Sequence, residues 1–223
     1  MSIIGWMLGL SPSQIAALQA TPAAVRDLVE VTQADASAAD LAEALSRMTP
    51  EQRKAAEVRN RALDQMPGQE EARSHLAAAR TRLGRFGTLR QALCLEKSWH
   101  ILHYLFTGHV DPSEAPGNAL LTGEPLGDDL GYGPARLHGA KETRDFADFL
   151  AAQNVMRLQQ RVNYHEMSSI PLYGMPASSR ADADTVAEYE SELREEVAYF
   201  FPRLRDYVSA MAEKQDGLLL WFS

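Results

Sequence analysis

The chain has 223 residues, of which 45% are apolar, enough to build one good hydrophobic core. Its net charge of −8 argues against general binding to nucleic acids or to anionic membranes, because both need a cationic surface. The single cysteine, Cys94, cannot form an internal disulfide, so we expect a cytoplasmic protein that needs no oxidising compartment.

The first elements are a strand and a helix. The nearly continuous apolar run from Ile3 to Leu10 predicts a strand that is buried on both faces. Ser11 and Pro12 are typical of a helix N-cap and first helical residue, so a helix is expected to follow at once. The apolar N-terminus lacks the basic segment and long apolar core of a signal peptide. No other stretch approaches membrane-spanning length, so no membrane partner is expected.

Residues 33–88 are Ala-rich and predict a helical insertion, with helices beginning at Ser37, at Pro50 and after the turn at Pro67-Gly68. Between Arg47 and Arg90 there are ten Lys or Arg against five Asp or Glu. This segment therefore carries about +5 and the remainder about −13. Two interpretations remain open: a basic layer that docks on the acidic body of the same protein, or a surface for an acidic macromolecular partner.

The segment LEKSWHILHYLFTG, residues 95–108, predicts a buried helix with one polar stripe. Glu96, His100, His103 and Thr107 follow each other at helical spacing. Two imidazoles one turn apart, beside a carboxylate, could bind a metal ion or act as an acid and base pair. Alternatively, backbone carbonyls or carboxylates of the following loop satisfy both histidines, which then only fix how that loop packs.

Residues 107–139 hold seven of the 14 glycines and four of the 11 prolines, which excludes one long helix. A short strand is expected at residues 132–137. The loop could form a cleft lined by Trp99, Tyr132, the carboxylate Glu124 and the guanidinium of Arg136. The alternative for the two charged residues is a salt bridge that stabilises the loop. His109 and His138, at the loop edges, are expected to be exposed.

The C-terminal part is predicted to be helical until its last strand. We expect helices at residues 140–153 and 155–167, a Pro- and Gly-rich turn at 170–179, and a long helix from Asp184 that Pro202 kinks or splits. A short strand is expected at residues 218–222. Strands at both ends and a helix-rich middle predict one α+β domain over residues 1–223, whose terminal strands share a small sheet packed by several helices.

Several catalytic motifs are absent from the sequence. His165-Glu166 is not followed by the second His of a zinc-protease helix, and there is no phosphate-binding loop that ends in Lys-Ser or Lys-Thr. Gly131-Tyr132-Gly133 lacks the third glycine of a dinucleotide fingerprint. No cofactor is required by the sequence, and none is identified.

Five segments together are similar to one known family: MSIIGWMLGLSP, LEKSWHILHYLFTG, LLTGEPLG, LGYGPARL and DGLLLWFS. In these motifs and their order the chain resembles the YfbM-like family of bacterial proteins, classed as a domain of unknown function. The resemblance implies an α+β fold whose terminal strands share a sheet, and it implies no activity, cofactor or catalytic residue. The stretch at about 33–88 is longer than expected for that family.

Two functions follow as hypotheses. The first is a non-enzymatic binding protein that engages a partner through the cleft beside the 95–107 helix or through the helical insertion. The alternative is a metal-assisted hydrolase or acid/base enzyme that uses His100 and His103, with Glu96 or Glu124 as base or orienting group. Substrate, partner and oligomeric state do not follow from the sequence.

Overall fold

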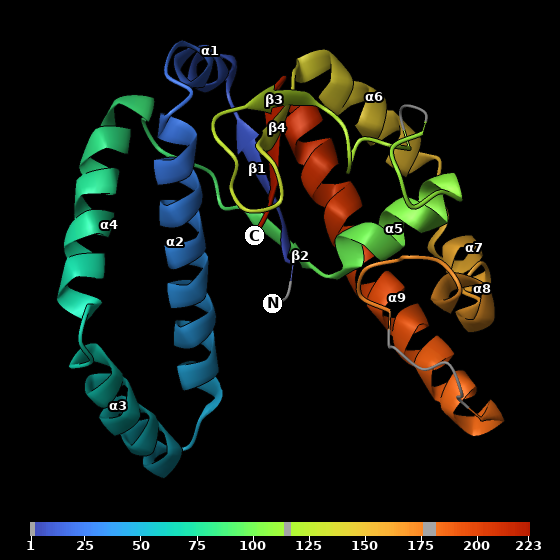
Figure 1. The fold of residues 1–223 in the computed structure, drawn as a ribbon, viewed down its shortest axis with the longest axis horizontal. Helices are drawn as coiled ribbons and strands as arrows, with labels where there is room; N and C mark the ends of the chain where they lie inside the picture. The colour runs from blue at the N-terminus through green and yellow to red at the C-terminus, as the bar shows by residue number, and fades with distance from the viewer. Residues whose placement is uncertain (1–2, 114–116, 176–181) are drawn as a thin grey trace.

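The computed structural model describes residues 3–113, 117–175 and 182–223, without the side chains of residues 57 and 59–64. Figure 1 shows a central sheet with helices on both of its faces. In chain order the elements are β1 (Gly5–Leu10), α1 (Pro12–Ala20), α2 (Ala24–Arg47), α3 (Pro50–Asp64), α4 (Gln69–Leu83), a 3-10 turn (Gly84–Phe86), β2 (Leu93–Glu96), α5 (Ser98–Thr107), β3 (Glu124–Leu126), β4 (Ala135–His138), α6 (Ala140–Ala151), α7 (Val155–Gln160), α8 (Tyr164–Ser168), α9 (Ala183–Glu213) and β5 (Gly217–Phe222).

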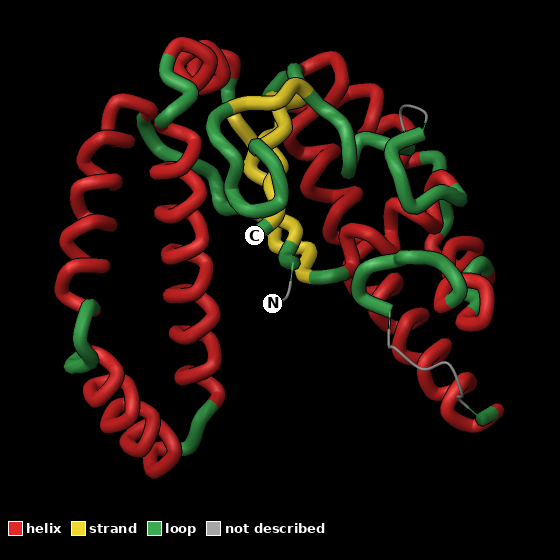
Figure 2. The backbone as a smooth tube through the Cα atoms, in the orientation of Figure 1, coloured by secondary structure: helices red, strands yellow, loops and turns green. Residues whose placement is uncertain are grey.

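The sheet has five antiparallel strands in the order β2-β1-β5-β4-β3, and Figure 2 shows them in yellow between the helices. The two terminal strands pair directly along their whole length, from Gly5 opposite Phe222 to Leu10 opposite Gly217. Every residue of β5 is buried, since both faces of this strand are covered. The expected α+β fold with both terminal strands in one sheet is therefore confirmed.

Alternate residues of the central strands enter two separate cores. Leu219 and Trp221 of β5 belong to the core beneath α2 and α4, together with Leu8 and Leu10 of β1. Leu218, Leu220 and Phe222 belong to the larger core beneath α5, α6 and α9. This division follows from the strand period of two, which sends successive side chains to opposite faces.

The connection from β1 to α1 forms as the sequence predicts. The Ser11 hydroxyl accepts a hydrogen bond from the Gln14 N–H at 3.3 Å, and the Gln14 side chain accepts one from the Ser11 N–H at 2.9 Å. This reciprocal capping box, followed by proline at the first helical position, fixes the start of α1. Ile15 and Gln19 of α1 then line a cavity.

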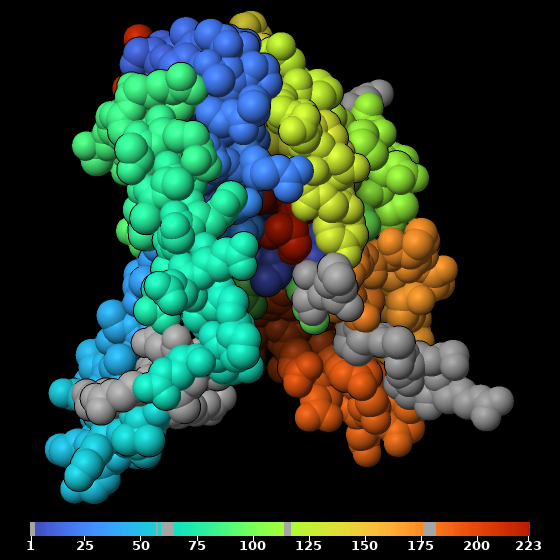
Figure 3. All heavy atoms as spheres, turned by 60° about the vertical axis from the view of Figure 1, so that its left-hand side comes forward, coloured from blue at the N-terminus to red at the C-terminus, as the bar shows by residue number. Residues whose placement is uncertain are grey.

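Helices α2, α3 and α4, residues 24–83, form a helical arm. The first third of α2 is buried on the sheet through Val25, Leu28 and Val29, whereas residues from Asp35 onward are mostly exposed. Figure 3 shows the far end of the arm separated by a hollow from the C-terminal helices. Part of the basic charge of residues 47–90 is neutralised by acidic residues of α2. Arg82 forms an ion pair with Asp27 at 2.7 Å, and Arg80 pairs with Asp35.

On the opposite face, the long helix α9 crosses the sheet. Asp182 caps its N-terminus by accepting a hydrogen bond from the Thr185 N–H at 2.8 Å. Its apolar stripe is buried at Leu193, Val197, Leu204, Val208 and Met211, as its periodicity predicts. The helix continues past Pro202 without a break, so the expected split does not occur. None of the described helices combines the length and the apolar character that crossing a membrane requires.

Several predicted boundaries are wrong. Ser37 does not begin a helix but lies inside α2, because the surrounding alanines favour helix and supply no break. Residues 155–167 form two short helices, since Asn154 and Asn163 each cap a separate N-terminus. The short strand expected at 132–137 begins at Ala135. Residues 176–179 of the expected turn lie outside the described residues.

Glu96 is also misplaced by the helical prediction. It ends strand β2 with a positive φ of 47°, and α5 begins only at Ser98. Glu96 pairs with Gly5 of β1 and so belongs to the sheet, although its spacing from His100 in the sequence fits a helix. The exposed Glu96 side chain is therefore not one turn before His100 on the same helix.

Candidate functional site

His100, on α5, is buried and uses both of its ring nitrogens. Its Nδ1 accepts a hydrogen bond from the Tyr173 N–H at 3.0 Å, so the ring proton lies on Nε2, 2.8 Å from the Val110 carbonyl oxygen. The Trp99 ring stacks on the imidazole with 4.7 Å between centroids. Burial is the main cause that holds the pKa of His100 below its ordinary value. The ring is thus a neutral link between α5 and two loops.

His103, the second histidine of the stripe, has no exposed surface. Its Nε2 lies 3.3 Å from the Asp111 carbonyl oxygen, and its Nδ1 has no hydrogen-bond partner among the described residues. Burial lowers the pKa of His103 to about 4, because the charged imidazolium cannot be solvated there. This side chain is a buried neutral group that solvent does not reach.

The two histidines therefore lie close together, with ring centroids 6.3 Å apart, and their Nε2 atoms are both hydrogen-bonded to the loop that follows α5. Of the sequence-based alternatives, satisfaction by backbone carbonyls of that loop is the one that the hydrogen bonds match. Within the described parts of the chain, no three His, Cys, Asp or Glu side chains are grouped so that they could hold a metal ion.

The four residues of the expected cleft lie in different surroundings. Trp99 is packed in the core against Phe222, at 4.3 Å between ring centroids, whereas Tyr132 is 39% exposed on the glycine-rich loop. The Arg136 guanidinium donates a hydrogen bond to the Leu121 carbonyl, and burial lowers its pKa. Glu124, on the strand paired with that of Arg136, lines a cavity that none of the other three residues lines.

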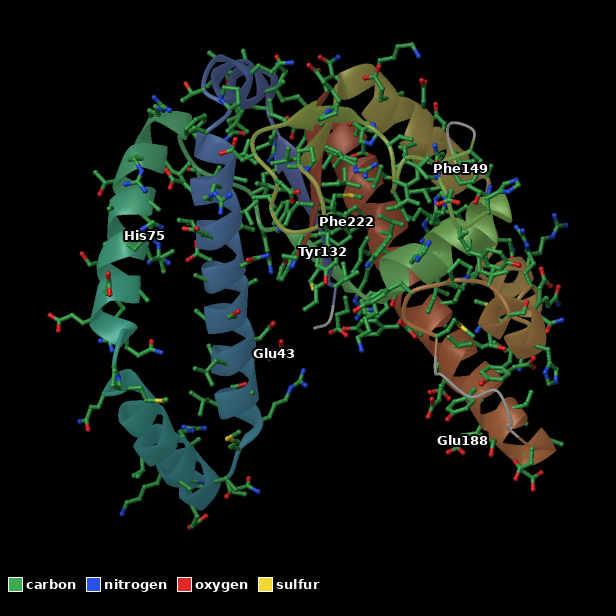
Figure 4. The ribbon with its side chains drawn as sticks, in the orientation of Figure 1. Glu43, His75, Tyr132, Phe149, Glu188 and Phe222 are labelled. Carbon is green, nitrogen blue, oxygen red and sulfur yellow. The ribbon has the colours of Figure 1, made fainter. Side chains whose placement is uncertain are left out.

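That cavity, which we call the α6 cavity, has a volume of about 820 Å³. One wall is the loop from Ala119 to Glu124, so the glycine-rich segment does contribute to a cavity. The opposite walls come from α1, from the end of β4 and from α6, rather than from α5. Its lining residues are Ile15, Gln19, Ala119, Thr122, Gly123, Glu124, Leu137, His138, Gly139, Glu142, Asp145, Asp148 and Phe149. Figure 4 labels Phe149 on α6.

His138 belongs to the inner lining of the α6 cavity and is only 6% exposed, which corrects the expectation that it is a surface residue. It is buried because β4 pairs with the central strand β5, placing His138 opposite Leu218. Its Nε2 lies 2.9 Å from the Ala119 carbonyl oxygen. Burial is the main cause that lowers its pKa, so this side chain is a neutral group. His109, by contrast, is exposed as expected.

Carboxylates dominate the polar lining. Glu142, Asp145 and Asp148 come from α6, and Glu124 comes from β3. Asp145 is bound by Lys141 at 2.6 Å, and Glu124 accepts a long hydrogen bond of 3.4 Å from Gln19. No Lys or Arg is among the residues that line the cavity in the described structure. The rest of the lining includes four apolar side chains, those of Ile15, Ala119, Leu137 and Phe149.

Sequence reasoning did not identify this site, apart from Glu124. One signal was present: acidic residues recur every three positions at 142, 145 and 148, which keeps them near one side of a helix. The cavity itself leaves no local signal, because its walls come from residues 15 to 149 of the chain.

Comparisons with known proteins give a family and a fold. The family model described as "Domain of unknown function (DUF1877)" matches residues 1–221, a span that includes the helical arm. The crystal structure of YfbM, a protein of unknown function from Escherichia coli, is similar with a TM-score of 0.53 and 16% sequence identity. That match covers 99% of each chain and confirms the resemblance to the YfbM-like family. No curated protein matches.

Proposed function

The chain belongs to the DUF1877 family, a domain of unknown function, and from that premise we propose that it is a non-enzymatic binding protein whose ligand site is the α6 cavity. The observation that carries the proposal is the cavity itself. A volume of about 820 Å³ is within the range of small-molecule sites. An apolar lining with a few convergent polar groups is also typical of such sites.

The state of the histidines supports binding over catalysis. A general acid or base must reach the proton that it transfers, within hydrogen-bond distance or through one water. His103 has no exposed surface, and His100 is only 8% exposed with both nitrogens engaged. Neither lines the α6 cavity. The enzyme hypothesis built on these two residues therefore receives no support from their geometry.

A second binding surface is proposed on the helical arm. Three large apolar side chains of the arm are exposed, namely Leu41 (45%), Val58 (62%) and Met66 (52%). The outer part of the arm, from Asp35 onward, is mostly exposed, so a protein partner can reach all three side chains. If a protein partner binds there, Leu41→Asp and Val58→Asp abolish its stoichiometric association. Met156→Asp, which changes an equally exposed apolar residue on α7, retains it.

We also propose a cytoplasmic location. It is supported by the single cysteine, since the described fold forms without a disulfide. Burial raises the pKa of the Cys94 thiol, which makes it an unreactive group that is compatible with a reducing compartment.

Ligand-observed NMR with a fragment library of cationic, neutral and anionic members tests the α6 cavity as a binding site. Gln19→Trp adds a large ring at a residue of α1 that lines the cavity, whereas Ala16→Trp places the same ring at an exposed position of α1 that does not line it. The expected result is at least one fragment class that binds the wild type and the Ala16 variant but not the Gln19 variant. Absence of any fragment sensitive to Gln19→Trp would contradict the proposal.

A further inference from the structure

We infer that the α6 cavity takes an organic cation, a primary amine or guanidinium group carried on a short apolar segment. This inference rests on the proposed binding function and names the chemical class of its ligand. It follows from the charge of the lining, from the spacing of the carboxylates and from the apolar walls.

The negative charge of the lining favours a ligand that carries a positive charge. Four carboxylates from two elements face one cavity, and no cationic side chain of the described structure lines it. All four carboxylates are solvent-exposed, so the attraction for a cation comes from four like charges that converge on one cavity and not from the burial of any one of them. An anionic ligand would be repelled there, whereas a cation would be attracted.

Three of the four carboxylates have no ion-pair partner among the described residues, and one of these three, Glu124, is hydrogen-bonded. Asp145 is paired with Lys141, whose side chain is 80% exposed, and Glu124 is bound by Gln19. For Glu142 and Asp148 the described residues provide no ion pair, although both line the cavity. His138 does not offset them, because its burial keeps the imidazole neutral. The cavity therefore holds two acceptors that are available to a donor from a ligand.

The arrangement does not suit a bare metal ion. Among the described residues, these carboxylates are not grouped closely enough to count as a three-ligand metal site. Ca²⁺ needs six to eight oxygen ligands within about 2.3–2.6 Å, whereas much of this lining is carbon. A cation that carries its charge on a larger organic body can meet one or two carboxylates and still fill the remaining space.

The apolar walls define the rest of the ligand. Ile15, Ala119 and Leu137 contribute aliphatic surface, and Phe149 contributes a ring that is partly exposed. An aromatic face attracts a nearby ammonium or guanidinium group through its quadrupole. Phe149 is held in place by Phe106, at 5.5 Å between ring centroids and nearly perpendicular. Apolar carbons of the ligand gain from burial against these walls, and its charged end pairs with Glu142 or Asp148.

The glycines of the lining preserve this space. At Gly139 a Cβ would lie 2.9 Å from the Glu142 carboxylate, which would force that side chain to move. At Gly123, whose φ of +129° disfavours other residues, a Cβ would lie 3.2 Å from the His138 Nε2. Gly123 is therefore the position at which another residue would be strained, whereas at Gly139 the flexible Glu142 side chain can move aside.

The test uses three probes with the same apolar body: 4-phenylbutylamine, 4-phenylbutan-1-ol and 4-phenylbutyrate. Binding to the full chain is measured by isothermal titration calorimetry and located by ¹H–¹⁵N NMR shifts. We expect the amine to bind at least about tenfold more tightly than the alcohol, with no binding of the carboxylate, because hydrogen bonds to charged groups are the stronger ones.

The double variant Glu142→Gln, Asp148→Asn removes two charges from the cavity at nearly constant shape. Glu188→Gln, Glu192→Gln removes the same charge from exposed positions of α9 and is the matched control. The amine is expected to lose about tenfold or more in affinity on the first variant. On the control variant its affinity stays within about twofold, since distant surface charges are screened.

The outcomes separate the two levels of the proposal. One outcome is that the alcohol or the carboxylate binds as tightly as the amine and loses its binding in the Gln19→Trp variant. In that case the cavity is a binding site, but the cationic class of the ligand is wrong. Equal loss of amine binding on both double variants shows nonspecific attraction to the acidic protein and overturns the inference. If none of the probes binds while other fragments do so at the cavity, the inference fails and the binding function stands.

Discussion

The histidine stripe of α5 and the carboxylate stripe of α6 are built from similar sequence patterns, yet they have opposite surroundings. His100 and His103 are buried, neutral and hydrogen-bonded to the loop that follows α5. Glu142 and Asp148 face a cavity of about 820 Å³, and no ion pair is described for them. Polar residues at helical spacing thus stabilise the fold in one place and are available to a ligand in the other. The difference lies in what packs against each helix.

The largest effect is expected from His103→Ala. Truncation leaves a cavity in the core and removes the donor that faces the Asp111 carbonyl oxygen. The free energy of unfolding is expected to fall by about 3–4 kcal/mol. Urea denaturation followed by circular dichroism measures the change. His109→Ala, at an exposed loop position, is the control and is expected to remain within about 0.5 kcal/mol of the wild type.

The pH dependence of stability is the next largest effect. The pKa of His103 falls from 6.5 to about 4 on folding, so between these values the unfolded chain binds more protons than the folded one. The stability that the neutral His103 contributes to the fold is therefore fully present above pH 6.5. As the pH falls toward 4 this stability is lost, which lowers the free energy of unfolding by about 3 kcal/mol. Unfolding free energies measured between pH 7 and pH 4 are expected to decline less steeply in His103→Gln. Parallel curves for the two proteins would show that His103 is not the responsible group.

A smaller loss is expected from His100→Gln, because an amide retains one donor and one acceptor at the position of the imidazole. The two hydrogen bonds to Val110 and Tyr173 lengthen, and stacking with Trp99 is lost. We expect a decrease of about 1–2 kcal/mol in the free energy of unfolding. Thermal unfolding by calorimetry checks this value. A change as large as that of His103→Ala would mean that the two histidines are equally critical to the core.

The cavity carboxylates are expected to contribute least to stability. Glu142→Gln with Asp148→Asn removes two like charges that have no described ion pair, so the free energy of unfolding should change by no more than about 0.5 kcal/mol. Chemical denaturation beside the wild type measures it. A loss above about 2 kcal/mol would assign these residues to the structure, as for the histidines.

The sequence correctly predicted the elements that depend on residues nearby in the chain or on a long apolar repeat. The terminal strands, the capped start at Ser11 and the apolar stripe of α9 were correct, since each depends on period or capping chemistry. Glu96 was misplaced because a four-residue strand directly precedes α5 and is fixed by pairing with β1. The burial of His138 and the α6 cavity depend on strand order and on contacts across more than 100 residues. Local pattern carries no information about either.

The most direct measurement is a calorimetric titration of 4-phenylbutylamine into two variants side by side, His100→Gln and the double variant Glu142→Gln, Asp148→Asn. If the histidines serve the fold and the cavity serves the ligand, the histidine variant binds within about threefold of the wild type. The cavity variant then loses at least about tenfold in affinity. The opposite pattern, with binding lost in the folded histidine variant and kept in the cavity variant, would contradict the assignment of both regions.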